Sequence, residues 1–159
     1  MQRATREFIK ARQPHCKYVV ETKQVILVGG GVPNKCYTNA HSRLNKSKSI
    51  RLVSGWIIEP FNAITNSTEI VQHFWNATDD GYHFDSTFEP HTKRYDYVVD
   101  MDLLTYCQEN DHKLTSHLAS SLFYKNGLYQ TVDENTDGSL AYAGIDILKT
   151  DLLYRTNLI

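Results

Sequence analysis

The chain has 159 residues, of which 41% are hydrophobic and 22% charged, and this composition is typical of one globular domain. Its 17 Lys and Arg residues nearly balance its 18 Asp and Glu residues, so a nucleic-acid partner held by phosphate contacts is not expected. No apolar run approaches the ~20 residues that cross a bilayer, and we therefore expect no membrane partner.

The first predicted element is a helix over residues 2–12. It must end before Pro14, because the residue that precedes a proline is disfavoured in the α region. No apolar segment follows its basic residues, as a secretory signal would require, so we expect a cytoplasmic protein. Two β-branched runs, 17–20 and 24–28, predict short strands on either side of a turn.

A glycine-rich loop over residues 29–34 leads into a second predicted helix. Cys36, Ala40 and Leu44 are spaced four residues apart, which places them on one helical face. Cys36 would open this helix, where free backbone N–H groups and the positive end of the helix dipole favour a thiolate. Cys36 is therefore a candidate nucleophile; the alternative is a small buried hydrophobic residue, which is what most free cysteines are.

The middle of the chain predicts a meander of strands. Residues 49–59 carry apolar side chains on both faces, which indicates a central strand. Residues 70–77 and 82–85 flank a turn at 78–81 that ends in Asp-Gly, and this pattern predicts a hairpin. A further strand is expected over residues 95–100.

The last third of the chain has helical spacing over residues 102–109, 115–124 and 145–154. The sequence therefore predicts an α+β fold with a central antiparallel sheet, the Cys36 helix packed on it, and additional terminal helices. Because no repeat or linker interrupts the chain, we expect a single domain over residues 1–159.

The predicted hairpin supplies a partner for Cys36. Alternation along a strand puts His73 and Trp75 on one face of the first arm, and Asp85 on one face of the second arm. With the turn at Asp-Gly, the pairing across the hairpin brings His73 within a few residues of Asp85. An imidazole–carboxylate pair of this kind fixes the histidine tautomer and directs the ring toward a nucleophile.

The order of Cys36, His73 and Asp85 along the chain resembles the core of transglutaminase-like proteins, which belong to the wider papain-like group of cysteine hydrolases. His-x-Trp-Asn, Asp-Gly and Asp-Ser-Thr around the hairpin carry this resemblance. The residues Cys-Tyr-Thr-Asn-Ala at the start of the predicted helix, and Gly-Trp in the central strand, are also similar to small bacterial and phage proteins with that core. The resemblance covers about residues 34–87.

The resemblance implies a role for each matching residue. Cys36 would be the nucleophile, His73 the general base and then the general acid, and Asp85 the group that orients the imidazole. The Cys36 backbone N–H and one side-chain donor would hold the oxyanion. Candidates for oxyanion or substrate binding are Asn34, Trp56 and Trp75. Two departures from the family pattern are the serine between Asp85 and the following threonine, where proline is commoner, and the lack of a glutamine shortly before Cys36.

A Cys, His and Asp set forms a thioester from an amide, isopeptide or ester and passes the acyl group to water or an amine. We therefore expect a thiol hydrolase or acyltransferase without a cofactor, whose partner is a peptide or protein substrate or a small amide. The sequence has no calcium-binding loop like that of large transglutaminases, which favours hydrolysis over protein cross-linking. If the chain is encoded by a phage, it would act in the host cytoplasm.

Two alternatives use the same residues differently. His73, His83 and His91 could bind a metal, but no HxH or HExxH spacing supports such a site, so we expect none. The other alternative is a catalytically silent binding module of the same fold that inhibits or redirects a host or partner protein. The sequence leaves the oligomeric state open. Three cysteines without CxxC spacing predict free thiols, with neither disulfides nor a cysteine zinc site: Cys16, Cys36 and Cys107.

Overall fold

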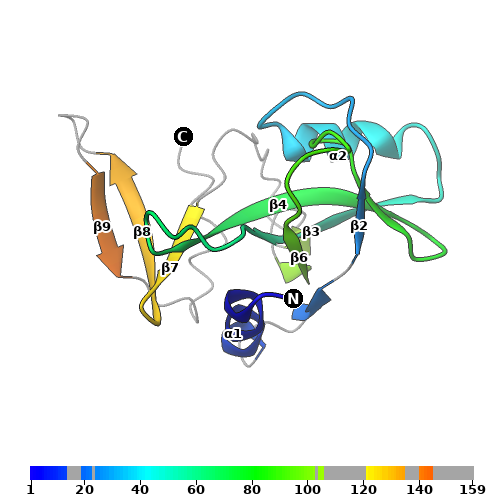
Figure 1. The fold of residues 1–159 in the computed structure, drawn as a ribbon. Coiled ribbons are helices and arrows are strands. Elements are labelled where there is room, and N and C mark those ends of the chain that lie inside the picture. Colours follow the sequence, from blue (N-terminus) through cyan, green and yellow to red (C-terminus); the bar gives the residue numbers. More distant parts are fainter. Residues whose placement is uncertain (14–18, 23, 103, 106–120, 135–139, 145–159) are drawn as a thin grey trace.

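The computed structural model describes residues 1–159 except 14–18, 23, 103, 106–120, 135–139 and 145–159, and it has a mixed α+β fold (Figure 1). Its helices are α1 (Arg3–Arg12) and α2 (Cys36–Leu44). Its strands are β1 (Val19–Thr22), β2 (Val25–Leu27), β3 (Ile50–Ile58), β4 (Thr68–Thr78), β5 (His83–Asp85), β6 (Asp96–Asp100), β7 (Ser121–Lys125), β8 (Leu128–Glu134) and β9 (Leu140–Gly144). No helix within these ranges has the length and apolar character needed to cross a membrane.

The strands form one sheet, whose main path runs β1-β6-β3-β4-β7-β8-β9 (Figure 1). All pairs on this path are antiparallel, whereas β2 pairs in parallel with β5, which lies beside β4. The α+β class and the largely antiparallel sheet are thus confirmed. β7 pairs with β4 over Thr68–Val71, and β5 pairs with it at Asn76 and Ala77. The part of β4 between these two pairings contains His73.

The central strand predicted over residues 49–59 is β3. It pairs with β4 along its whole length, from Ile50 opposite Thr78 to Ile58 opposite Ile70, and with β6 on its other side. Its last six residues are all buried, as expected for a strand that is covered on both faces.

Each face of the central strands contributes to its own hydrophobic cluster. On one face, the cluster contains Trp56 and Phe74 of the sheet, together with Phe8 of α1 and Ala40 of α2. The cluster on the other face comprises Val53, Ile57, Trp75, Ala77, Tyr97 and Val99. The first cluster packs both helices against the central strands, so the helix that begins at Cys36 has a fixed position against β4.

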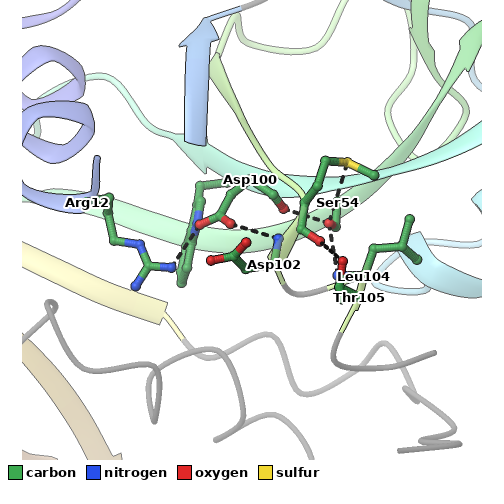
Figure 2. Close-up of polar contacts among 8 residues, drawn as sticks. Arg12, Ser54, Asp100, Asp102, Leu104 and Thr105 are labelled. Atoms are coloured by element: carbon green, nitrogen blue, oxygen red, sulfur yellow. Dashed lines mark hydrogen bonds and ion pairs between the residues drawn. The ribbon is translucent and has the colours of Figure 1, made fainter. Parts of the chain in front are cut away.

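A buried ion pair anchors α1 to β6 (Figure 2). Arg12 Nη2 lies 2.9 Å from Asp100 Oδ2, and neither side chain is exposed to solvent. The indole N–H of Trp56 donates to the same carboxylate oxygen at 2.9 Å. Removing one member of such a pair leaves an uncompensated charge in the core, which typically costs about 3–5 kcal/mol.

Several predicted elements are present with nearly the expected bounds. The helix over 2–12 is α1, the helix opened by Cys36 is α2, the hairpin is β4 and β5, and the strand over 95–100 is β6. The two predicted strands near residues 17–28 also form, as β1 and β2, but they pair with β6 and β5 rather than with each other.

The prediction of a helix over 115–124 is wrong for the part that the structure describes. Residues 121–125 form β7, because the free edge of β4 offers backbone partners to one side of this segment and β8 offers them to the other. The strands β8 and β9 were not expected either. Of the helix predicted over 102–109, residues 102, 104 and 105 are helical and the remainder lies outside the described residues, as does the helix predicted over 145–154.

Candidate active site

The hairpin brings His73 and Asp85 together in the core. Asn76 pairs with Phe84 and Ala77 with His83, so the side chains of His73 and Asp85 emerge on the same face of the two strands. The His73 Nε2 atom lies 2.6 Å from Asp85 Oδ2, and both side chains are almost fully buried. The pair that the sequence predicted is therefore present as a short, charge-assisted contact.

Two further donors hold the Asp85 carboxylate. The backbone N–H of Thr87 donates to Oδ1 at 2.7 Å, and the hydroxyl of Tyr97 donates to Oδ2 at 2.8 Å. Burial by itself would raise the pKa of Asp85, but the charge of His73 and these hydrogen bonds outweigh burial and lower the pKa below its usual value. Asp85 is therefore a carboxylate at neutral pH.

Cys36 is the first residue of α2 and is 7% exposed. The preceding residue, Lys35, makes no side-chain cap, and no acidic residue lies in the first turn of the helix. The N–H groups of this turn and the helix dipole therefore produce a positive potential at the thiol.

The glycine loop is fixed to the start of α2 by Asn39. The Asn39 side chain accepts from the Val32 N–H at 2.9 Å and donates to the Val32 carbonyl at 2.8 Å. Gly31 donates from its backbone to the Ser86 carbonyl at 2.8 Å, and a Cβ at Gly31 would lie only 2.4 Å from that oxygen. The loop thus links the Cys36 helix to the segment that follows Asp85.

His73 interacts with Cys36 as well as with Asp85. Burial would lower the pKa of His73, but the charges of Asp85 and Cys36, and hydrogen bonds to both, raise it from 6.5 to about 10. Since Nε2 contacts Asp85, the other ring nitrogen, Nδ1, is left for the thiol. At neutral pH the site therefore contains an imidazolium between a carboxylate and a sulfur atom.

Aromatic rings fix the plane of the imidazole. Phe88 stacks on His73 with ring centroids 5.3 Å apart, and Trp75 stacks at 6.1 Å. Tyr97 approaches edge-on at 6.0 Å. His73 therefore has little freedom to turn away from Asp85, and its own exposure is only 3%.

Of the three residues predicted to bind the oxyanion or the substrate, Trp56 lies in the same hydrophobic cluster as Cys36, and Trp75 stacks on His73. The Trp56 indole N–H donates to Asp100, and the Trp75 indole N–H donates to His83 Nδ1 at 2.9 Å. Asn34 is exposed and has a left-handed backbone, with φ of 59°. Both indole N–H groups thus already have partners inside the protein, so the predicted oxyanion donors that remain are the Cys36 backbone N–H and Asn34.

The rival metal site finds no support in the described part of the chain, where no three His, Cys, Asp or Glu side chains are grouped as metal ligands. His83 Nδ1 instead accepts the hydrogen bond from Trp75. Of the three cysteines, Cys36 is a free thiol, and Cys16 and Cys107 lie outside the described residues.

Sequence reasoning missed Tyr97, Thr87 and Asn39. Thr87 has a local signal, because an N–H two residues after an aspartate commonly bonds to its side chain. Tyr97 and Asn39 have none, since their contacts depend on the pairing of β6 with β3 and on the path of the glycine loop. Tyr97 also lines a pocket of about 590 Å³, together with residues 24–27, Pro90, Thr92 and residues 94–96.

Comparisons of the chain with protein-family models, with curated proteins and with solved structures gave no match.

Proposed function

We propose that the chain is a thiol hydrolase or acyltransferase that cleaves an amide, isopeptide or ester bond with Cys36, His73 and Asp85. The observation that carries the proposal is the His73 imidazole, which is held between the Asp85 carboxylate and the Cys36 thiol in a buried setting. A transglutaminase-like or papain-like origin of this set is part of the proposal, because it explains the order helix, strand, strand for the three residues.

The arrangement supports a two-step reaction. The Cys36 sulfur, as a thiolate, attacks the carbonyl carbon, and the electron pair of the C=O bond moves onto the oxygen. When the tetrahedral intermediate collapses, the bond to the leaving amine or alcohol breaks and His73 transfers its proton to that leaving group. Neutral His73 then removes a proton from water or an acceptor amine, which attacks the thioester and releases Cys36.

Each of the three groups has a distinct part in this scheme. His73 is protonated at neutral pH, so its positive charge stabilises the thiolate before the substrate binds. Asp85 is a positioning residue, because it contacts the imidazole and not the sulfur. The start of α2 would add the Cys36 backbone N–H as a donor to the oxyanion.

A specific observation favours a second candidate, a catalytically silent binding module of the same fold. Cys36 and His73 are both nearly buried, and Phe88 covers one side of the imidazole. In such a module the same contacts would serve to stabilise the core, and the thiol would not react with a substrate.

Acylation by p-nitrophenyl acetate distinguishes the two candidates. The thiol hydrolase predicts a burst of p-nitrophenol and an added acetyl group on the peptide that contains Cys36, and both should be lost in Cys36→Ala. The peptides with Cys16 and Cys107 serve as internal controls. Equal acetylation of the three cysteines, or none at Cys36, would refute the hydrolase and favour the binding module.

A further inference from the structure

We propose that the hydroxyl of Tyr97 is a positioning group of this site, which holds the Asp85 carboxylate in the orientation that His73 requires. The inference rests on the proposed function, because it assigns a role within the same set of residues. It adds a fourth member to that set, from a strand that the sequence motif does not include.

The contacts of Asp85 leave its carboxylate little freedom. Oδ2 accepts from Tyr97 at 2.8 Å and contacts His73 at 2.6 Å, whereas Oδ1 accepts from the Thr87 N–H at 2.7 Å. Two donors on one oxygen and one donor on the other fix both the position and the plane of the group. Without the Tyr97 hydroxyl, the carboxylate would be held by the Thr87 N–H and by the histidine that it is meant to orient.

Tyr97 is itself rigidly placed. It lies on β6 opposite Ile57 of β3, and it is 3% exposed. Its ring packs edge-on against two aromatic neighbours. The ring centroid of Tyr97 lies 5.2 Å from that of Trp75 and 6.0 Å from that of His73. Burial and the negative charge of Asp85 raise the pKa of Tyr97 above its ordinary value, so the hydroxyl stays protonated and acts as a donor.

A neighbouring tyrosine offers a matched control. Tyr95 lies two residues away on the same side of the chain and lines the same pocket as Tyr97. Its ring packs on Phe88 at 5.0 Å, and it is not among the partners of Asp85. Tyr95→Phe therefore removes a hydroxyl from a neighbouring, partly buried ring without removing a donor to the carboxylate.

The test compares wild type, Tyr97→Phe and Tyr95→Phe by the rate of Cys36 alkylation with iodoacetamide as a function of pH. The titratable groups that face Asp85 are His73 on β4 and Tyr97 on β6, and Cys36 at the start of α2 acts through His73. Because Asp85 loses a donor in Tyr97→Phe, the pKa of Asp85 rises. The acidic limb of the plot of Cys36 alkylation rate against pH should therefore move to a higher pH by about one unit. The limb should stay in place in Tyr95→Phe.

A ¹⁵N titration of the His73 imidazole provides a second readout that does not need a reactive thiol. The acidic step in the Nε2 signal should also move upward in Tyr97→Phe, and this shift should vanish when Asp85→Asn is added. A lower melting temperature with an unmoved acidic step would show that Tyr97 only packs in the core, and would overturn the proposal. If Cys36 proves inert while the imidazole step moves, the proposed catalysis fails and the positioning bond stands.

Discussion

The buried pair of His73 and Asp85 makes a specific prediction for stability as a function of pH. The pKa of His73 is about 10 in the folded protein, compared with 6.5 when the ring is free, so the native state binds more protons in this interval. The stabilisation is fully present below about pH 6.5 and is lost as the pH rises through about 10. The displacement of the pKa corresponds to up to roughly 5 kcal/mol in the free energy of unfolding.

The contribution of Asp85 to stability changes with pH in the opposite direction. The pKa of Asp85 is lowered by folding, so its contribution is present above the unfolded value near 3.8 and is lost as the pH falls below that value. The two effects together place the greatest stability between about pH 4 and about pH 6.5. Urea denaturation across the range from about pH 2 to about pH 11 measures both limbs.

His73→Gln removes the titrating imidazole, whereas His91→Gln removes an exposed histidine and serves as the matched control. We expect the decline in unfolding free energy between about pH 6.5 and about pH 10 to disappear in His73→Gln and to persist in His91→Gln. If the unfolding free energy declined by the same amount in His73→Gln as in wild type, this result would refute the argument, because the alkaline loss would then come from other groups.

Three further substitutions test the fold and the site. Asp100→Ala removes the carboxylate that pairs with Arg12 in the core and should lower the free energy of unfolding by about 3–5 kcal/mol in urea denaturation; a loss below about 1 kcal/mol would contradict the importance of the buried pair. Gly31→Ala places a methyl group against the Ser86 carbonyl and should slow Cys36 alkylation while lowering the melting temperature; unchanged values of both would show that the loop tolerates a side chain. Cys36→Ala should abolish acylation but cost only about 1 kcal/mol of stability, and a much larger loss would indicate a cysteine retained for packing.

The elements with strong local signals were predictable from the sequence. The spacing of Cys36, Ala40 and Leu44 defines one face of α2, and Cys36 is its first residue in the structure. The hairpin follows from the Asp-Gly turn, in which Gly81 has a φ of 92° that glycine adopts without strain. The same turn also predicted that His73 lies within a few residues of Asp85 across the hairpin.

The features that the sequence did not predict depend on contacts between residues that are far apart in the sequence. The Trp56 indole was a candidate oxyanion donor, but a carboxylate 44 residues away, Asp100, accepts its hydrogen bond. Tyr97 reaches Asp85 only because β6 pairs with β3, and no local pattern encodes that pairing. In the same way, Leu122 lies in a strand opposite Ile70, where the free edge of β4 prevails over a helical spacing.

The central claim is that Cys36 is a nucleophile activated by His73. It is tested most directly by the rate of iodoacetamide alkylation at each cysteine as a function of pH, measured by peptide mass spectrometry in wild type and in His73→Ala. The proposed site predicts that Cys36 reacts fastest of the three below pH ~7 and that its rate at that pH falls about tenfold or more in His73→Ala. An inert Cys36, or one that reacts at the same rate in both proteins, would contradict the claim.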